Sequence, residues 1–230
     1  MSLGTILGVW AHPDDETYLC GGLMARAVRD GDRVVCVTAT RGELGSTDPE
    51  RWPAGPGLAA IRTAELERSL ACLGVSDHMW LDYPDGGCAD VDADAAVARL
   101  RAVVSAVRPQ TVLTFGPDGM TGHPDHQAVS RWALAAAAGS GAQVHFATNT
   151  PEWLDTYRGR LDAAGAFMGA EPPSTPRDRL SIHLRLEGEL LEMKYAAITA
   201  QTSQVEPMVA LFGEDEMRAA LAEEAFRLAD

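Results

Sequence analysis

The chain has 230 residues, of which 46% are hydrophobic and 23% charged, the size and composition of one soluble α/β domain with a full core. Its 33 acidic residues against 19 Lys and Arg leave a formal net charge of −14. This acidic balance argues against nucleic acid or an anionic membrane as a partner, since both need a broad basic surface. It leaves room for a negatively charged substrate that one or two local arginines bind.

Three further features concern the setting of the protein. No stretch of 18 apolar residues is present, so we expect no membrane insertion. The N-terminal region lacks the basic segment and the long apolar segment of a signal peptide. The four cysteines show neither a CxxC pair nor zinc-knuckle spacing, which favours buried thiols in a reducing compartment. We therefore expect a cytoplasmic protein.

Over the first 150 residues, short apolar runs alternate with segments of 3.6-residue periodicity, the pattern of repeated βα units. The expected strands are residues 5–11, 33–39, 79–81, 111–115 and 143–148. The expected helices are residues 17–29, 58–73, 93–107 and 124–138. The connection over residues 40–57 is rich in Gly and Pro and long for a compact domain, as lids and binding loops often are.

Beyond residue 150 the alternation weakens. Residues 180–186 alternate like an edge strand, and residues 188–199 and 214–229 are expected to be helical. The chain contains no internal repeat, and one domain over residues 1–230 is the simplest organisation. The sequence predicts a Rossmann-like, doubly wound α/β fold: a mostly parallel sheet of order 3-2-1-4-5 with helices on both faces.

Two similar motifs follow the first and fourth expected strands: HPDD at residues 12–15 and HPDH at residues 123–126. Each by itself could be an ordinary helix start, because proline at the first helical position with acids around it is common. In the order 3-2-1-4-5, however, strands one and four are neighbours at the topological switch point, where such folds bind ligands. Both motifs should therefore face one crevice.

The first βα turn also bears on nucleotide binding. It carries Asp14, Asp15 and Glu16 where a dinucleotide-binding turn has glycines. Three acids would repel a pyrophosphate at the helix N-terminus, so we reject a nucleotide-binding module. Glu16 is left with the ordinary role of an acid in the first turn of a helix.

The residue types of the two motifs fit a catalytic zinc site, which uses three His, Asp or Glu ligands and keeps a position for water. His12 and Asp15 are three residues apart at a helix start, and His126 is the natural third ligand from across the crevice. Asp14 then lies close enough to act as general base toward the metal-activated water.

A second pair is expected from the HPDH motif. A carboxylate bonded to an imidazole raises the basicity of the ring, so Asp125 beside His123 favours a protonated histidine. Such a histidine could stabilise an oxyanion or protonate a leaving amine.

Taken together, the segments HPDDE at residues 12–16 and GHPDH at residues 122–126 resemble the zinc-dependent de-N-acetylases of the LmbE/PIG-L family. Weaker similarity covers residues 40–43, the helix around Arg62, and residues 194–204, where Gln201 stands in place of a common histidine. The resemblance implies a Rossmann-like fold and hydrolysis of the acetamide of an amino sugar. It implies metal ligation by His12, Asp15 and His126, with Asp14 as base and His123 at the oxyanion or leaving group.

Three residues are candidate substrate contacts. Arg62 and Arg41 could bind a sugar hydroxyl or a phosphate, although arginines at such positions are often simply solvated. Asp85 could accept hydrogen bonds from sugar hydroxyls, although an Asp-Gly-Gly turn also explains it.

The sequence therefore predicts a metal-dependent hydrolase that deacetylates an N-acetylglucosamine-type amino sugar or its conjugate, with Zn²⁺ expected and Fe²⁺ or another divalent metal as alternatives. A non-haem Fe(II) oxygenase, which uses the same two-His-one-carboxylate set, stays open. So does a metal- or carbohydrate-binding protein without catalysis. The expected partner is a small amino-sugar conjugate, and a homo-oligomer is left open.

Overall fold

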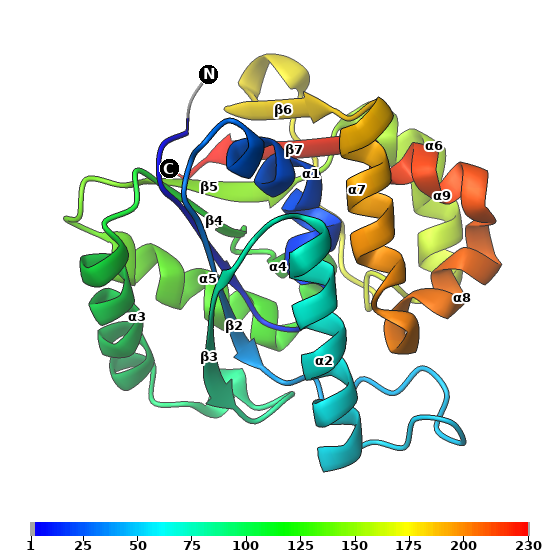
Figure 1. Ribbon diagram of the computed structural model, residues 1–230, viewed down its shortest axis with the longest axis horizontal. Helices are drawn as coiled ribbons and strands as arrows, with labels where there is room; N and C mark the ends of the chain where they lie inside the picture. The colour runs from blue at the N-terminus through cyan, green and yellow to red at the C-terminus, as the bar shows by residue number, and fades with distance from the viewer. Residues whose placement is uncertain (1–2, 230) are drawn as a thin grey trace.

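Strand β1 (Ile6–Trp10) lies near the middle of a seven-stranded sheet in the computed structural model, which describes residues 3–229 (Figure 1). The strand order is β3-β2-β1-β4-β5-β7-β6. The other strands are β2 (Val34–Thr40), β3 (Asp77–Tyr83), β4 (Thr111–Phe115), β5 (Gln143–Thr148), β6 (Ile182–Arg185) and β7 (Glu223–Leu228). The first five are parallel, and β7 runs antiparallel to β5 and to β6. The predicted order 3-2-1-4-5 is confirmed, with two antiparallel strands added at one edge.

Helices cover both faces of this sheet, as predicted (Figure 1). One face carries α1 (Asp15–Arg29), α2 (Pro56–Cys72) and α7 (Gly188–Thr199), and the other carries α3 (Ala93–Val107) and α5 (Pro124–Ala137). All the residues of β1, β2 and β4 are buried, because a parallel sheet covered on both faces needs strands that are apolar throughout.

A second layer of helices lies at the end of the sheet that carries β7 (Figure 1). It comprises α6 (Pro151–Ala163), α8 (Thr202–Phe212) and α9 (Glu214–Leu221), which share a small apolar core with α7. The sequence predicts no helix over α6 or α8, and the single turn α4 (Gly119–Gly122) falls between the predicted strand at residues 111–115 and the predicted helix at residues 124–138. One domain over residues 1–230 stays a prediction.

The predicted helix over residues 214–229 is wrong in its second half. Helix α9 ends at Leu221, and Glu223–Leu228 forms β7. Phe226 is fully buried and pairs with Ala147 of β5. The segment has good helix formers, but pairing with two strands and burial of its apolar residues outweigh that local preference.

Strand β7 also shapes the helix that carries the HPDD motif. Helix α1 is interrupted at Cys20, whose φ of −146° and ψ of 20° are not helical. The carboxylate of Glu224 accepts hydrogen bonds from the backbone N–H groups of Gly22 (2.8 Å) and Leu23 (2.7 Å). These are the donors that the interruption leaves free, so Glu224 caps the second half of α1.

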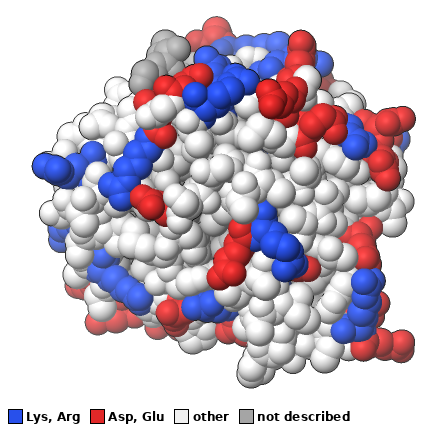
Figure 2. Space-filling view, viewed as in Figure 1, with Lys and Arg blue, Asp and Glu red and all other residues white. Residues whose placement is uncertain are grey.

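The charged residues are spread rather than gathered. On the face seen in Figure 2, Lys and Arg stand singly or beside Asp and Glu, including one mixed group near the middle of the view, with uncharged surface between the groups. Within residues 3–229, no helix is long and apolar enough to cross a membrane.

Candidate metal centre

The two histidine motifs meet where β1 and β4 end. Strands β1 and β4 are parallel neighbours, with Gly8 opposite Leu113, so their carboxyl ends lie at one edge of the sheet. His12 follows β1 by two residues, and His123 is the N-cap of α5, reached from β4 through the turn of α4. The predicted crevice at the switch point is therefore present, and it brings both motifs together.

Potential ligand atoms of three residues converge in this crevice. His12 Nδ1 lies 3.1 Å from His126 Nε2 and 3.6 Å from Asp15 Oδ2, and His126 Nε2 lies 3.4 Å from Asp15 Oδ1. Ligand atoms around a tetrahedral zinc ion are about 3.4 Å apart. All three residues are less than 10% exposed. The spacing fits a small divalent cation.

Hydrogen bonds on the far side of each ring decide which nitrogen faces the centre. His126 Nδ1 lies 2.9 Å from the carbonyl oxygen of Gly119, which can only accept, so this nitrogen carries the proton. His12 Nε2 lies 3.1 Å from Asp85 Oδ1 and 3.3 Å from Asp125 Oδ2, which assigns its proton to that side. Two imidazole lone pairs and a carboxylate then face one another, an arrangement that a cation stabilises.

The pKa shifts of the site residues also indicate that this position favours a positive charge. Burial lowers the pKa of His12, but hydrogen bonds with Asp125, Asp15 and Asp85 outweigh it and raise that pKa well above its usual value. Burial raises the pKa of Asp15, but His126 and His12 outweigh it and lower the value to about 2. The acids therefore stabilise a positive charge at the position that the three ligand atoms surround.

Two other groupings share His12: one with His123 and His126, and one with Asp85 and Asp125, each with possible ligand atoms within 4.8 Å of one another. Protein groups already use the lone pairs of the second grouping. Asp125 accepts from the N–H groups of Gly86 (2.8 Å) and Cys88 (3.0 Å). In the set with Asp15, the lone pairs of His12 and His126 face one point, while Asp15 Oδ2 also accepts the backbone N–H of His12 (2.8 Å).

The predicted pairing of Asp125 with His123 is wrong. The backbone N–H of Asp125 donates to His123 Nδ1 (3.1 Å), while its carboxylate turns inward to His12 and to the backbone of residues 86–88. Asp125 is fully buried in the first turn of α5, and the N–H groups of Gly86 and Cys88 hold its carboxylate in that inward direction. The carboxylate orients a different histidine from the one expected.

His123 is accordingly neutral rather than protonated. Burial and the nearby charge of His12 lower its pKa. Because His123 Nδ1 accepts a backbone N–H, the proton of the neutral ring is on Nε2. Its ring lies 4.7 Å from that of His12 and 4.9 Å from that of His126. The crevice thus contains an uncharged N–H donor beside the three ligand atoms.

Asp14 occupies a strained backbone position beside the centre. Its φ is 128°, in the region that favours glycine, and such strain costs about 1–3 kcal/mol. Arg62 Nη2 holds it through Pro13 O (2.6 Å) and Asp14 Oδ2 (3.3 Å). Burial raises the pKa of Asp14 to about 7 although Arg62 lowers it, so the carboxyl is poised to take up and release a proton.

The predicted substrate contacts lie in different surroundings. Arg62 is 4% exposed and binds the turn at residues 13–14. Asp85 has both carboxylate oxygens against protein: one faces His12, and the other accepts the Leu44 N–H (2.8 Å). Arg41 lies apart from the centre, bonded to Asp82 and Thr63 and stacked over Trp80. Substrate binding by these three residues stays a prediction.

Glu16 is more than a residue of the helix start. It is fully buried and accepts hydrogen bonds from Thr17 Oγ1 (2.7 Å) and the Asp14 N–H (3.3 Å), and burial raises its pKa to about 8. Gln201 joins this network by donating to Thr17 Oγ1 (3.1 Å) and Ser69 Oγ (3.0 Å). The signal was readable, since Glu16 shares a helix face with Leu23 and Ala27 at spacings of seven and eleven residues.

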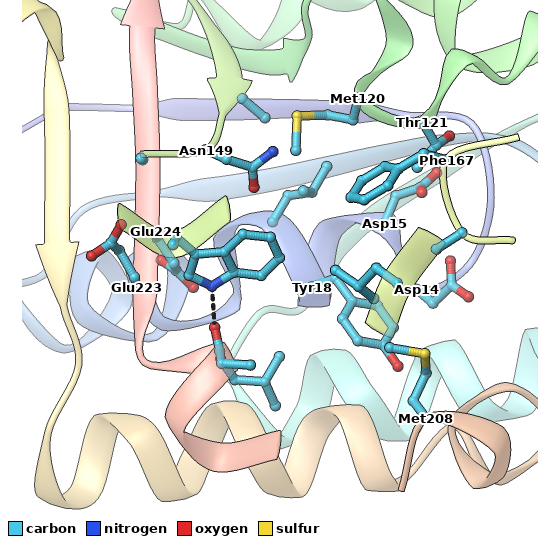
Figure 3. A pocket seen from close by; sticks show the side chains of 18 of the residues that line it. Asp14, Asp15, Tyr18, Met120, Thr121, Asn149, Phe167, Met208, Glu223 and Glu224 are labelled. Carbon is cyan, nitrogen blue, oxygen red and sulfur yellow. Dashed lines mark hydrogen bonds between the residues drawn. The ribbon is translucent and has the colours of Figure 1, made fainter. Parts of the chain in front are cut away.

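A cavity of about 350 Å³ opens from the centre toward the helices of the C-terminal part. Figure 3 shows Asp14 and Asp15 at one end and Glu223 and Glu224 at the other. Trp153 also lines the cavity and donates from Nε1 to Ala220 O (2.9 Å). Most of its walls come from residues after 147, where the sequence pattern was weakest.

With the site defined, known proteins can be compared. The family model described as "GlcNAc-PI de-N-acetylase" (PIG-L) matches residues 7–137, more than half of the chain. The chain belongs to the PIG-L family. A relative from Rhodococcus opacus (strain B4), "1D-myo-inositol 2-acetamido-2-deoxy-alpha-D-glucopyranoside deacetylase", is 31% identical over 89% of this chain and 83% of its own length. A protein of that name from Kineococcus radiotolerans is 41% identical, over 60% of this chain and 46% of its own.

Solved structures share the fold of this chain. The zinc-inhibited form of teicoplanin deacetylase Orf2 matches with a TM-score of 0.69 at 19% identity, over 98% of this chain and 99% of that one. The N,N'-diacetylchitobiose deacetylase from Pyrococcus horikoshii matches with a TM-score of 0.64 at 22% identity, over 98% and 83%. At these identities the likeness supports the fold. Family membership makes the chain a hydrolase of the de-N-acetylase class and argues against the oxygenase alternative.

Proposed function

We propose that this PIG-L family member removes the acetyl group of an N-acetylglucosamine conjugate, and that the conjugate with myo-inositol is the first substrate to test. The name shared by its relatives supports this choice. One observation carries the proposal: lone pairs of His12 and His126 and the Asp15 carboxylate converge, with Asp14 beside them. The cytoplasmic location and the small-molecule partner stay predictions.

His12, Asp15 and His126 are the proposed ligands of a divalent metal, and Zn²⁺ is the proposed ion because two imidazoles and one carboxylate are a ligand set of hydrolytic zinc sites. A bound Zn²⁺ would act as a Lewis acid and lower the pKa of water at the site toward about 7. Asp125 and Asp85 would hold the His12 ring in the required tautomer through Nε2.

Asp14 is the proposed general base. Its carboxylate takes one proton from the water that attacks the acetyl carbonyl carbon, and a pKa of about 7 suits a group that must be ionised yet basic at neutral pH. Arg62 orients the carboxylate, and the strained backbone at Asp14 sets its direction. The same group then delivers the proton to the leaving nitrogen.

His123 supplies the electrostatic part. Its Nε2–H, fixed by the contact at Nδ1, donates to the oxygen of the acetyl carbonyl as negative charge develops there. The reaction balances: a C–O bond forms from water, the C–N bond breaks, and the products are acetate and a free amino sugar. The neutral His123 ring suits the role of oxyanion donor, because it does not have to take up a proton from solution before it donates.

The test is release of primary amine from N-acetylglucosaminyl-inositol by the zinc-loaded protein and by its Asp14→Asn variant. We expect a kcat about 10²- to 10⁴-fold lower in the variant, with unchanged zinc content, because only the base is lost. Asp82→Asn is the matched control, an exposed aspartate that also has a positive φ (52°). Equal rates in Asp14→Asn and wild type would remove Asp14 as base.

Amine release from none of a panel of N-acetylglucosamine conjugates would remove the proposed function. Consumption of O₂ by the Fe²⁺-loaded protein would instead support the oxygenase alternative.

A further inference from the structure

The cavity beside the metal centre is open to solvent and holds about 350 Å³. That volume falls within the range of small-molecule pockets, about 300–1,000 Å³. Because Asp14, Asp15 and His126 form one end of it, whatever fills the cavity is continuous with the reacting group.

The walls are mainly apolar. They include the side chains of Phe115, Leu161, Phe167, Met208, Phe212 and Met217. Bonds to protein occupy the polar groups at the far end. Asn149 Nδ2 donates to Pro173 O (3.1 Å), and Glu224 binds Lys194 and the N–H groups of α1.

A sugar ring is therefore a poor occupant. Each hydroxyl moved into the cavity would lose water and find few free partners, which is costly for a buried polar group. Within the described part of the chain, the Tyr18 hydroxyl is one buried cavity group without a hydrogen-bond partner. Figure 3 places it near Asp14, at the end close to the metal centre. A hydrocarbon chain has no such requirement.

The polar surroundings lie on another side of the centre. His123 and Asp85 are not among the described residues that line the cavity. Near Asp85, Glu43 accepts the Asp85 N–H at Oε1 (3.0 Å), and its Oε2 is buried without a partner in the described residues. This side of the centre carries polar and charged groups in place of apolar walls. The two ends of an N-acylated amino sugar thus match two different environments.

We propose that the cavity binds the acyl chain of the scissile amide, so that the preferred substrates carry an N-acyl group longer than acetyl. This inference rests on the proposed function and specifies its substrate class. The chemistry is otherwise the same: water adds to the carbonyl carbon, the C–N bond breaks, and the products are a fatty carboxylate and the free amine. The acyl chain lies among the apolar walls, and the sugar stays on the side of His123 and Asp85.

A chain-length series tests this on the wild-type protein. The substrates are N-acetyl-, N-butyryl- and N-hexanoylglucosamine, followed by amine release. We expect kcat/KM to rise about threefold for each added methylene, and about 80-fold from acetyl to hexanoyl, mainly through a lower KM. A flat or falling series overturns the proposal. The proposal is also overturned if kcat/KM rises with the length of the alkyl aglycone in a series of alkyl N-acetylglucosaminides.

Helix α9 offers a matched pair of variants. Ala220 lines the cavity and is half-buried, while Ala219 beside it is exposed. Ala220→Leu should lower the ratio of hexanoyl to acetyl kcat/KM at least tenfold, because it fills space that the chain needs. Ala219→Leu adds the same side chain outside the cavity and should leave that ratio unchanged. Equal ratios in both variants contradict the assignment, and melting temperatures check that both fold.

Failure of the proposed function can be separated from failure of this inference by calorimetry, which needs no turnover. The wild-type protein should bind hexanoate tens of times more tightly than acetate, by the same increment per methylene. Equal affinities would overturn the cavity assignment even if the acetyl substrate is hydrolysed. If no substrate is turned over but hexanoate binds more tightly, the proposed function fails and the apolar chain site stands.

Discussion

Asp125 shows how one buried carboxylate can set the chemistry of a histidine far away in the sequence. It is held by two backbone N–H groups, from Gly86 and Cys88, and it also lies 3.3 Å from His12 Nε2. Such an acceptor fixes which nitrogen of His12 is free to bind a metal. Burial raises the pKa of Asp125, but His12 and the two N–H groups outweigh it and keep that pKa low, so the charge is present at neutral pH.

Asp125→Asn should weaken zinc binding about 10- to 100-fold, the usual effect of removing the group that orients a metal-binding histidine. Competition with a chromophoric chelator measures the dissociation constant. Asp92→Asn is the control, because Asp92 also accepts backbone N–H groups, at the start of α3, and asparagine caps helices equally well. Unchanged zinc affinity in Asp125→Asn would mean that His12 does not bind the metal through Nδ1.

At the scale of elements, β7 joins the C-terminal part of the chain to the helix that follows the HPDD motif. Glu224 reaches from β7 into the interruption of α1, and Lys194 of α7 forms an ion pair with it at 2.8 Å. Both side chains are fully buried. Helix α1, which begins at Asp15, is thereby linked to α7 and β7, two elements far from it in the sequence.

Lys194→Met should lower the free energy of unfolding by about 3–5 kcal/mol, because it leaves the Glu224 carboxylate buried without its cation. Urea denaturation measures the loss. The double variant with Glu224→Gln should lose less than the sum of the single losses. Arg33→Met, which breaks an exposed pair with Asp77, should cost about 0–1 kcal/mol. Comparable losses for Lys194→Met and Arg33→Met would contradict the role of the buried pair.

Strand β3 contains a group that couples stability to pH away from the metal centre. Burial, and to a lesser extent Arg41, lower the pKa of His78 to about 4. An unfolded histidine has a pKa near 6.5, so between these values the unfolded state binds more protons. The unfolding free energy that His78 contributes is therefore complete above pH 6.5 and lost as the pH falls toward 4.

His78→Gln should remove this pH-dependent contribution to the free energy of unfolding. Between pH 7 and pH 4, the wild type should lose about 2 kcal/mol more unfolding free energy than the variant, measured by urea denaturation at both values. Glutamine can still bond Thr38 Oγ1, which lies 2.9 Å from His78 Nε2. The same pH dependence in both proteins would show that His78 does not titrate in this range.

For the whole molecule, the metal should act as a stabilising ligand because its three proposed ligands come from both halves of the sheet. Zn²⁺ at 100 times its dissociation constant should add about 2.7 kcal/mol. For a chain of this length that is a rise in melting temperature of about 5–10 °C. Elemental analysis should find one zinc ion per chain.

Asp14→Asn should show the same rise, since it removes no ligand, whereas His126→Ala should show none. A rise of equal size in His126→Ala would place the zinc ion elsewhere.

Much of the fold could be read from local patterns because the parallel strands are buried on both faces. The runs that became β4 and β5 were predicted to the residue. The C-terminal part could not be predicted in this way, because its structure depends on pairing with remote strands. Residues 223–228 have the composition of a helix and became β7 only because β5 and β6 offered open edges. Glu16 was placed at a helix start although its spacing to Leu23 and Ala27 indicated the buried face, and its contact with Gln201 depends on a segment remote in the chain.

The sequence by itself determined which residues meet. Two motifs at the ends of adjacent parallel strands must face one crevice, and their spacing identifies which side chains can reach it. Only the tertiary structure decided how those side chains are used, because hydrogen-bond direction depends on segments remote in the chain. The loop at residues 86–88 turned Asp125 from His123 to His12. Helices α6, α8 and α9 line an apolar cavity that no motif encodes, since its shape arises from packing between elements rather than within one.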